Sequence, residues 1–408
     1  MFSNPGIISR TSAFILACGN GRRLDPLTRN RAKPLVPFGG IFRIIDFTLS
    51  NCVNSGLKNL FLLAQRKQSS LGEYVERVPN SLVECLLPGQ GRNFRGTADA
   101  VFQNIHRLEG EGRDFVLLLP ADQVSKLDYT KLLRWHAESG ADITVAATPH
   151  PLTAAPLGML EVDGENGVTA AGDRNELRRR AGKGKRTLLV STGIYVFNIR
   201  ALLKLVIEDA FRTRSSHDFT RDVIPASIAS HRVSAYNLAS ADGLPRYWRD
   251  VGTIDAYHRS HMELLLVDSA FDPYNDALWP VYAFGNPHAG ISCLRPWSGS
   301  WSRDSVVSCG SAISGARLVQ SVIGPAARVH ESAEVQNSVL LPGVHVGRGA
   351  RICRAVIEEG TRIPEGMEIG YDRELDSRRF RVTEGGVVMV TAEAASSSQP
   401  DWSKVLEA

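Results

Sequence analysis

Residues 323–369 read IGPAARVHESAEVQNSVLLPGVHVGRGARICRAVIEEGTRIPEGMEI, and this stretch decides the fold of the C-terminal part of the chain. Small aliphatic residues recur in it every six positions, and whole sets recur every seventeen. The pattern, with glycine or proline near the corners, predicts a parallel β-helix with three faces per coil. A β-sandwich with regular strand spacing is the alternative. Counted from residue 306, the repeat comprises Val306, Ala312, Leu318, Ile323, Val329, Val335, Leu340, Val346, Ile352, Ile357, Ile363 and Ile369.

The preceding part of the chain, from residue 11 to about residue 265, alternates short apolar runs with amphipathic segments. Strands and helices in this order predict an α/β domain with a Rossmann-like, mainly parallel sheet. Ligands of such sheets bind beyond the carboxyl ends of the strands. The sequence predicts strands at 14–17, 59–64, 115–119, 143–148 and 188–197, and helices at 98–108 and 129–139, the last of which is closed by Gly140.

Four prolines interrupt the stretch between these two patterns, which has few periodic apolar runs and which we interpret as a linker. The predicted organisation is therefore an α/β domain at 1–267, a linker at 268–302, a β-helix domain at 303–390 and a C-terminal tail at 391–408.

The composition is that of an ordinary globular protein. The chain has 408 residues, of which 43% are hydrophobic and 22% charged, and a formal net charge of +4. This charge suits anionic small molecules and gives no reason to expect nucleic acid. No apolar run approaches the ~18–20 residues of a membrane span, and the start does not resemble a signal peptide. The six cysteines are scattered without a Cys-x-x-Cys pair, which predicts reduced thiols in a cytoplasmic protein and argues against a zinc site.

The first candidate for chemistry is the loop after the first predicted strand, where Gly19 and Gly21 follow at once. Such glycines let the backbone turn its N–H groups toward phosphate. The loop lacks a P-loop lysine, and Leu24 replaces the third glycine of a dinucleotide fingerprint. A plain tight turn would explain the glycines alone. Arg23 and Lys33 favour the phosphate hypothesis, because two cations could neutralise a triphosphate and its developing pyrophosphate.

Two carboxylates are the second candidate. Asp122 follows the most apolar strand, and Asp250 precedes a helix that Thr253 could cap. Mg²⁺ takes one or two carboxylates plus phosphate oxygens, so this pair would suffice to hold it. Either aspartate alone could instead be a helix cap or a turn residue. A third junction contains Gly96, which would leave room for a flat base, and Thr97, which could cap the next helix.

Nine segments of the chain carry a family resemblance: 31–34, 38–40, 42–47, 49–56, 95–100, 193–197, 216–219, 247–253 and 363–367. Through them the chain resembles the bacterial ADP-glucose pyrophosphorylases, also called glucose-1-phosphate adenylyltransferases, over nearly its full length. The resemblance implies a nucleotidyltransferase domain followed by a left-handed β-helix, and the handedness rests on it alone. It also implies a homotetramer, or a hetero-oligomer with a paralogue, that anionic metabolites regulate.

The implied reaction converts ATP and α-glucose 1-phosphate to ADP-glucose and pyrophosphate, the first committed step of glycogen or other α-glucan synthesis. Carried over by resemblance, Arg23, Lys33 and Asp122 are catalytic, while Asp122 and Asp250 hold Mg²⁺. Two sets of binding residues are also implied. These are Leu16, Ala17, Gly19, Gly21, Gln65, Gly96, Thr97 and Ala98 for ATP, and Phe94, Gly158, Asp173, Arg174, Ser191 and Gly193 for the sugar phosphate.

The glycine-rich loop departs from the family pattern. Cys18 replaces the first glycine, and Arg22 replaces a threonine. Arg174 stands where the family has a lysine that grips the sugar phosphate, and Phe94 lacks the family's tyrosine hydroxyl. These changes keep open two alternatives to an active adenylyltransferase: a low-activity regulatory subunit, and an enzyme for another hexose 1-phosphate or base.

Regulation is expected to differ from that of well-known bacterial members. A lysine and a histidine used by them fall at Asn30 and Pro37, while Arg43 remains as a candidate effector residue. The basic stretch 172–187 is open to three interpretations: a solvated loop, a loop that recruits the sugar phosphate, and nucleic-acid binding, which has the least support.

Overall fold

The computed structural model describes residues 5–19, 21–65, 69–79, 82–90, 92–108, 112–149, 158–173, 175, 177, 187–239, 247–266, 271–285 and 300–397. The chain forms two compact units that are not consecutive blocks of sequence. The first unit comprises Met1–Asn20, Phe47–Ala121 and Ser125–Tyr247, and the second comprises Gly21–Asp46, Asp122–Val124 and Trp248–Ala408. The second half of the glycine-rich loop therefore belongs to the same unit as the C-terminal repeat.

The first unit is built on a nine-stranded sheet in which β10, β9, β11, β6, β1, β4 and β5 are neighbours in this order, with β8 beside β11 and β12 beside β8. Its centre is parallel, since β1 pairs in parallel with β4 and β6. The long strand β11 runs antiparallel to β6, β8 and β9. The strands are β1 (Thr11–Ala17), β4 (Leu60–Ala64), β5 (Val83–Leu86), β6 (Phe115–Pro120), β8 (Ile143–Thr148), β9 (Met159–Val162), β10 (Val168–Gly172), β11 (Thr187–Asn198) and β12 (Val233–Asn237).

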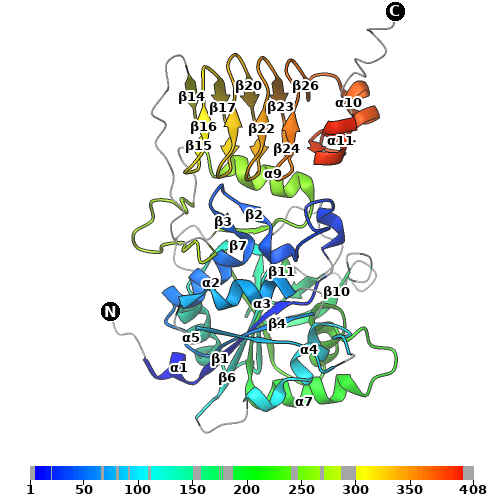
Figure 1. The fold of residues 1–408 in the computed structure, drawn as a ribbon. Helices are drawn as coiled ribbons and strands as arrows, with labels where there is room; N and C mark the ends of the chain where they lie inside the picture. Colours follow the sequence, from blue (N-terminus) through cyan, green and yellow to red (C-terminus); the bar gives the residue numbers. More distant parts are fainter. Residues whose placement is uncertain are drawn as a thin grey trace, which may run out of the picture. The chain divides into compact units, whose positions relative to one another are not determined.

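All five strands predicted in this region are present, and the helices α5 and α7 lie along the sheet (Figure 1). Phe14, Leu118 and Phe197 are fully buried in a core that includes Leu202 and Leu205 of α7. Gly140 closes α5 in the left-handed conformation, with φ 62°, as the sequence predicts. The helical elements are α1 (Pro5–Ser9), α2 (Ile44–Asn54), which begins in the second unit, α3 (Ser69–Glu76), α4 (Thr97–Phe102), η5 (Ile105–Leu108), α5 (Tyr129–Ser139), α7 (Ile199–Ala210), η6 (Phe219–Val223) and α8 (Ile224–Ser227).

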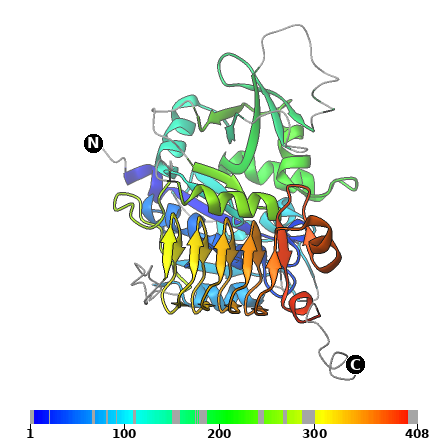
Figure 2. The same cartoon turned by 90° about the horizontal axis from the view of Figure 1, so that it is seen from above.

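The C-terminal repeat of the second unit folds into three stacked ladders of short strands, which form the prism of a parallel β-helix (Figure 2). Successive coils are parallel, and only β27 and β28 pair antiparallel. The first ladder is β14 (Trp301–Arg303), β17 (Arg317–Val319), β20 (Glu334–Gln336), β23 (Arg351–Cys353) and β26 (Glu368–Ile369). The second is β15 (Val306–Val307), β18 (Val322–Ile323), β21 (Val339–Leu340), β24 (Ala355–Ile357), β28 (Val388–Val390) and β27 (Arg381–Val382), and the third is β16 (Ala312–Ile313), β19 (Arg328–Val329), β22 (His345–Val346) and β25 (Arg362–Ile363).

The predicted repeat is correct from Leu318 onward and wrong at its first two positions. Val307 and Ile313 are the buried residues of the first coil, whereas Val306 is half-buried and Ala312 exposed. Val307 aligns with Ile323, sixteen residues later, while the following coils advance by seventeen. The first coil is one residue shorter because its corner at Gly315 is tighter, so a constant period places these core positions one residue too early.

Helix α9 (Ile254–Glu263) bonds to two other parts of the second unit through its histidines. Gly39 N donates to Nε2 of the buried His261 over 3.0 Å, which joins α9 to the hairpin of β2 (Pro37–Phe38) and β3 (Phe42–Arg43). Nε2 of His258 donates to the Asn337 carbonyl of the β-helix over 2.7 Å. Burial lowers the pKa of His261 to about 3, so its ring stays neutral. The other elements are η1 (Arg22–Leu24), η2 (Lys33–Leu35), β7 (Gln123–Lys126), β13 (Tyr247–Asp250), α10 (Arg373–Arg379) and α11 (Ala392–Ser397).

Among the described residues, no helix combines the length and the apolar character that crossing a membrane requires.

Candidate active site

Two cations and two carboxylates meet in the second unit. Lys33 lies in η2, and its side chain is only 8% exposed. Its Nζ lies 2.8 Å from Asp122 Oδ2 and 3.7 Å from Asp250 Oδ1. The more exposed Arg23 places Nη2 at 3.7 Å from Asp250 Oδ2. Four residues that the sequence predicts for catalysis or metal binding thus form one cluster.

The loop geometry brings Gly21 close to Lys33. Gly21 adopts the left-handed conformation, with φ 62°, immediately before η1. The Thr28 hydroxyl donates to the Gly21 carbonyl over 3.0 Å, which folds the loop back on itself. A Cβ at Gly21 would lie 3.0 Å from Thr28 Cγ2 and 3.3 Å from Lys33 Cβ. Glycine is therefore required here both by the backbone conformation and by the close approach of the lysine stem.

Gly252 is a residue of this cluster to which the sequence analysis gave no role. A Cβ at this position would lie 2.9 Å from Asp250 Oδ1 and 3.0 Å from Arg23 Nη2. The absence of a side chain at Gly252 lets these two charged groups approach each other. A signal was present, because the glycine stands two residues after Asp250 within one of the segments that carry the resemblance.

The neighbour of Asp122 is held by a hydrogen bond within the same unit. Trp248 Nε1 donates to Gln123 Oε1 over 2.7 Å. Gln123 directly follows Asp122, and its amide oxygen serves as the acceptor for the indole. The bond joins the short segment that carries Asp122 to the segment that carries Asp250.

The donor set of the cluster fits a magnesium ion. Asp122 and Asp250 both reach the same ammonium group, so their carboxylates face a common point. Within the described ranges, no group of three or more His, Cys, Asp or Glu side chains is placed to hold a metal. Two carboxylate oxygens, completed by water and phosphate, are what Mg²⁺ ordinarily takes. The soft or nitrogen-rich set of a zinc site is not present in this cluster.

A second group of predicted residues lies in the first unit, around the start of α4. Gln65 Nε2 donates to the Phe94 carbonyl over 2.9 Å, and Phe94 N donates to Gln65 Oε1 over 3.1 Å. The Phe94 ring is buried in the core, so only its backbone faces Gln65. Ala98 N donates to the His217 carbonyl over 2.7 Å. The contact of Phe94 with a sugar phosphate stays a prediction.

The expectations for Gly96 and Thr97 require correction. A Cβ at Gly96 would lie 2.3 Å from the His217 carbonyl oxygen, so the protein's own backbone takes the space that the sequence analysis reserved for a base. Thr97 does not cap α4, whose N-cap is Gly96 without a side-chain bond. The Thr97 hydroxyl instead donates to Asp218 Oδ2 over 3.1 Å and accepts from Phe219 N over 3.0 Å.

The predicted sugar-phosphate residues Gly158, Ser191 and Gly193 lie together in the first unit. Ser191 N donates to the Gly158 carbonyl over 2.8 Å, and Gly193 N donates to Ser191 Oγ over 3.1 Å. Gly158 and Gly193 both have φ 77°. The Ser191 hydroxyl also donates to Tyr195 OH over 3.3 Å, and that hydroxyl bonds Thr220 Oγ1 over 2.8 Å. Burial raises the pKa of Tyr195 to about 12, so the phenol stays protonated.

Asp218, to which the sequence alone gives no role, joins these two groups of the first unit. Its Oδ1 accepts from Thr220 N over 2.9 Å, and its Oδ2 accepts from Thr97 Oγ1. A chain of bonds thus runs from Thr97 through Asp218 and Thr220 to Tyr195. The available signal was the segment 216–219, which carries the resemblance but contains no recognisable binding motif.

The strand end before the loop is also in the first unit. Leu16 O accepts from Ala121 N over 3.1 Å, and Ala17 is the last residue of β1. A Cβ at Gly19 would meet no atom within 4 Å, so the backbone there is open on that side. Cys18 directs its thiol into the protein, where Sγ donates to the Leu63 carbonyl over 3.4 Å. Burial raises the pKa of this thiol to about 12, so it stays neutral.

Comparisons with known proteins agree with this arrangement. The nucleotidyl transferase family model matches residues 12–266, and the model described as GlmU-like, C-terminal hexapeptide matches residues 298–390. A glucose-1-phosphate adenylyltransferase of Thiobacillus denitrificans is 41% identical over 96% of this chain and 93% of its own length. The glucose-1-phosphate adenylyltransferase of Methylobacillus flagellatus is 41% identical over 95% of this chain and 94% of its own length. That of Anaeromyxobacter sp. is 37% identical over 94% of this chain and 98% of its own length. This chain belongs to the glucose-1-phosphate adenylyltransferase family.

Family membership confirms the fold class and the nucleotidyltransferase assignment. The hexapeptide match and the parallel coils agree with a left-handed β-helix after the α/β domain. In the altered loop, the side chain that Cys18 adds is bonded to the neighbouring strand β4.

The structure gives no test of two of the sugar-phosphate predictions, Asp173 and Arg174. Asp173 follows β10, and its Oδ1 accepts from Asn175 N over 2.8 Å, as in a turn. Arg174 lies outside the described residues, as does most of the basic stretch 172–187. The role of both residues stays a prediction.

The predicted effector residue Arg43 has a structural bond in the adenylyltransferase chain. Its Nη1 donates to the Leu35 carbonyl over 2.9 Å. Asn30 and Pro37, at the positions of the family's effector lysine and histidine, line a small pocket with Arg31 and Glu359. Arg31 Nη2 and Glu359 Oε2 pair there at 2.6 Å, so the arginine already has an acidic partner.

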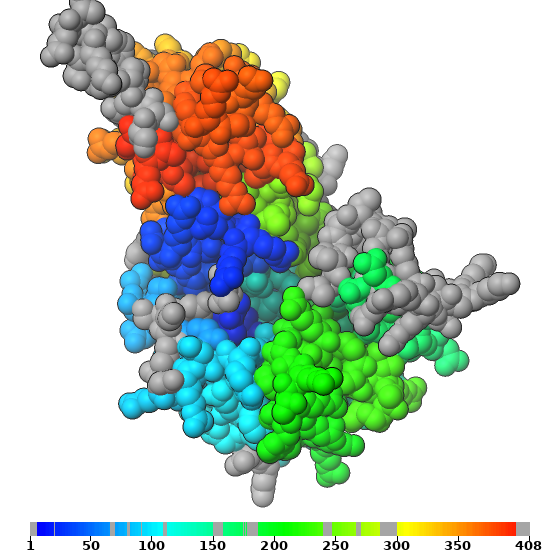
Figure 3. All heavy atoms as spheres, turned by 90° about the vertical axis from the view of Figure 1, so that its right-hand side faces the viewer, coloured from blue at the N-terminus to red at the C-terminus, as the bar shows by residue number. Residues whose placement is uncertain are grey.

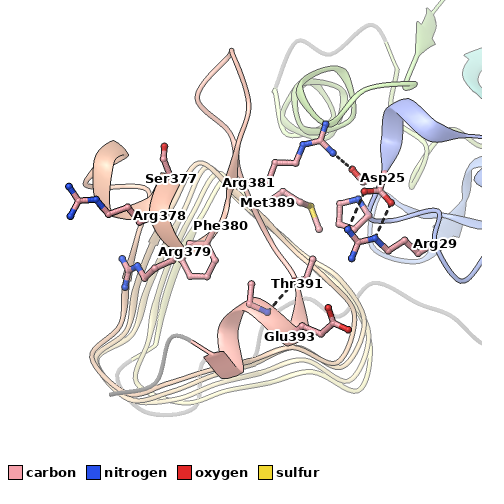
Figure 4. Close-up of a pocket in the computed structure, with 12 residues that line it drawn as sticks. Asp25, Arg29, Ser377, Arg378, Arg379, Phe380, Arg381, Met389, Thr391 and Glu393 are labelled. Carbon is pink, nitrogen blue, oxygen red and sulfur yellow. Dashed lines mark hydrogen bonds and ion pairs between the residues drawn. The ribbon is translucent and has the colours of Figure 1, made fainter. Parts of the chain in front are cut away.

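A larger cavity of about 610 Å³ lies nearby in the second unit (Figure 4). It is formed where the segment 21–46 meets the C-terminal residues of the same unit, drawn in blue and in orange to red in Figure 3. Arg381 Nη1 donates to the Asp25 carbonyl across this junction. The charged residues that line the cavity are Asp25, Arg29, Arg378, Arg379, Arg381 and Glu393.

Proposed function

We propose that this protein is a glucose-1-phosphate adenylyltransferase, which converts ATP and α-glucose 1-phosphate to ADP-glucose and pyrophosphate in glycogen or other α-glucan synthesis. The single observation that carries the proposal is the cluster of Lys33, Asp122 and Asp250. It occurs in a chain that matches relatives of this name over nearly their full length. Cations beside metal-binding carboxylates are what nucleotidyl transfer needs.

In the proposed reaction, a phosphate oxygen of glucose 1-phosphate attacks the α-phosphorus of ATP in line with the departing pyrophosphate. No covalent enzyme intermediate is required, so the protein contributes positioning and charge neutralisation. Arg23, which is exposed, would contact the triphosphate, and Lys33 would contact the phosphates nearest the reacting centre. Asp122 and Asp250 would hold Mg²⁺, which supplies further neutralisation of phosphate charge when bound.

The roles proposed in the first unit follow its hydrogen-bond network. Gln65, Thr97 and Ala98 would contact the adenine, while Leu16, Ala17 and Gly19 would present backbone to the nucleotide. Gly158, Ser191 and Gly193 would bind the sugar phosphate, with Tyr195 holding the Ser191 hydroxyl. Asp218 would hold the adenine-binding residues and the sugar-phosphate-binding residues in place relative to each other, through its bonds to Thr97 and Thr220.

We also propose that anionic metabolites regulate the enzyme. The cavity of about 610 Å³ supports this, because four arginines and only two acidic side chains line it. The Arg31–Glu359 pair and the replacement of two family cations at Asn30 and Pro37 favour altered or weak activation by sugar bisphosphates. Assembly as a cytoplasmic homotetramer, or with a paralogue, is proposed from the family resemblance alone.

The test is pyrophosphate release by the purified chain over a panel of nucleoside triphosphates and sugar 1-phosphates. The proposal expects the highest kcat/KM for ATP with glucose 1-phosphate. A higher value for another pair would replace the substrate assignment. If no pair reacts, and activity appears only on mixing with a paralogous subunit, the chain is a regulatory subunit and the proposal is wrong.

A further inference from the structure

The ammonium group of Lys33 occupies the point toward which both candidate metal ligands are directed. Its Nζ lies 2.8 Å from Asp122 Oδ2 and 3.7 Å from Asp250 Oδ1, while the side chain is 8% exposed. A buried ammonium needs charged or polar partners, because its desolvation is otherwise uncompensated. The two carboxylates provide them, so Lys33 is bound in place rather than resting on the surface.

The same oxygens cannot serve the lysine and a divalent cation in this geometry. Mg²⁺ binds carboxylate oxygens at about 2.0–2.1 Å, which is closer than an ammonium nitrogen approaches. An ion shared by both aspartates would therefore fall close to Nζ, and the two positive charges would repel each other strongly. The flexible four-carbon stem of lysine allows the ammonium to move to another anion.

Arg23 is bound to the cluster less tightly. Its single contact with Asp250 is 3.7 Å long, and its side chain is 67% exposed. An exposed pair of this length contributes little and is screened by solvent. The position of the Lys33 ammonium group therefore determines whether the two carboxylates can bind a divalent metal.

We propose that Lys33 is an exchangeable counterion that excludes divalent metal from Asp122 and Asp250 until a triphosphate arrives to bind its ammonium group. This inference rests on the proposed function, because it takes the two aspartates as metal ligands. It adds an order to binding: the metal enters together with the nucleotide, and each raises the affinity for the other. Such coupling is reciprocal by thermodynamic necessity.

The test is Mn²⁺ binding to the nucleotide-free protein, measured by electron paramagnetic resonance of free Mn²⁺. Lys33→Met removes the charge at nearly constant length, and Lys33→Gln is a second neutral variant in case the first fails to fold. Each is expected to bind Mn²⁺ at least about tenfold more tightly than the wild type. The double variant Lys33→Met with Asp122→Asn is expected to lose that gain.

Two controls separate exchange from a general change of charge. Lys33→Arg keeps the charge and is expected to bind Mn²⁺ as weakly as the wild type. Arg22→Met removes a charge from the exposed turn that also carries Arg23, and is expected to change the affinity less than threefold. If the neutral Lys33 variants bind Mn²⁺ no more tightly than Arg22→Met, the inference is wrong.

Failure of this inference and failure of the proposed function give different results. If the wild type makes ADP-glucose and the neutral Lys33 variants bind Mn²⁺ no more tightly than the wild type, only the exchange is contradicted. A wild type that turns over no substrate pair, with Mn²⁺ affinity that rises in Lys33→Met, contradicts only the proposed function.

Discussion

Substituting Gly252 with alanine should damage the active site while leaving the fold intact. A Cβ there would lie 2.9 Å from Asp250 Oδ1 and 3.0 Å from Arg23 Nη2. Ordinary carbon–oxygen contacts are about 3.3–3.6 Å, so one or both side-chain ends must retreat by roughly 0.5 Å. Because about 1 Å of misplacement can cost a factor of about 100, half of that predicts a roughly tenfold loss of kcat/KM, or ~1.4 kcal/mol of transition-state stabilisation.

The assay is steady-state pyrophosphate release, paired with urea unfolding. The atoms that must move are the ends of exposed side chains, so the free energy of unfolding should change by less than ~1 kcal/mol. Gly164→Ala is the matched control, since a Cβ at that exposed position would meet no atom within 4 Å. If Gly252→Ala retains the kcat/KM of Gly164→Ala, the Arg23–Asp250 geometry does not serve the reaction. A large loss of stability would refute the claim that the strain falls only on the site.

Three further substitutions or conditions test other parts of the structure. Gly96→Ala places a Cβ 2.3 Å from the His217 carbonyl oxygen, which is backbone, so we expect it to lower the free energy of unfolding in urea by ~3 kcal/mol; a change below 1 kcal/mol would contradict the close approach. Stability should fall as the pH drops from 6.5 toward 3, because His261 has a pKa of about 3 when folded and takes up a proton only on unfolding. The free energy of unfolding should be ~2 kcal/mol lower at pH 5 than at pH 7 because of this one histidine. His261→Gln should remove that part of the pH dependence, and a pH dependence that stays the same would assign it to other groups. Cys18→Ala should keep turnover within about twofold, because the thiol bonds to β4; a larger change would place the thiol at the substrate.

The regular parts of the fold were predictable because they depend on local periodicity. The central strands appear as short apolar runs, and the β-helix core follows a fixed spacing from Leu318 onward. The error at Val306 and Ala312 has the same origin, since one residue fewer at the Gly315 corner shifts the phase of every position before it. A constant repeat period therefore predicts the core positions of the regular coils correctly and those of the irregular first coil incorrectly.

The site residues were harder to place, because their contacts join distant segments. Lys33 and Asp122 are 89 residues apart, and no spacing rule connects them; the family resemblance supplied the grouping that the structure then showed. Thr97 has the sequence features of a helix cap, yet its hydroxyl bonds to Asp218, which is 121 residues away. Tyr195, Asp218 and Gly252 were missed for the same reason, since each acts through a partner that only the folded chain provides.

The central claim is that the cluster of Lys33, Asp122 and Asp250 carries out adenylyl transfer. The most direct measurement is the initial rate of pyrophosphate and ADP-glucose formation from ATP and glucose 1-phosphate, for the wild type beside Asp122→Asn. The substitution preserves shape and removes the charge, so it should lower turnover at least about 100-fold while the protein stays folded. Turnover equal to that of the wild type would remove Asp122 from the reaction and contradict the account.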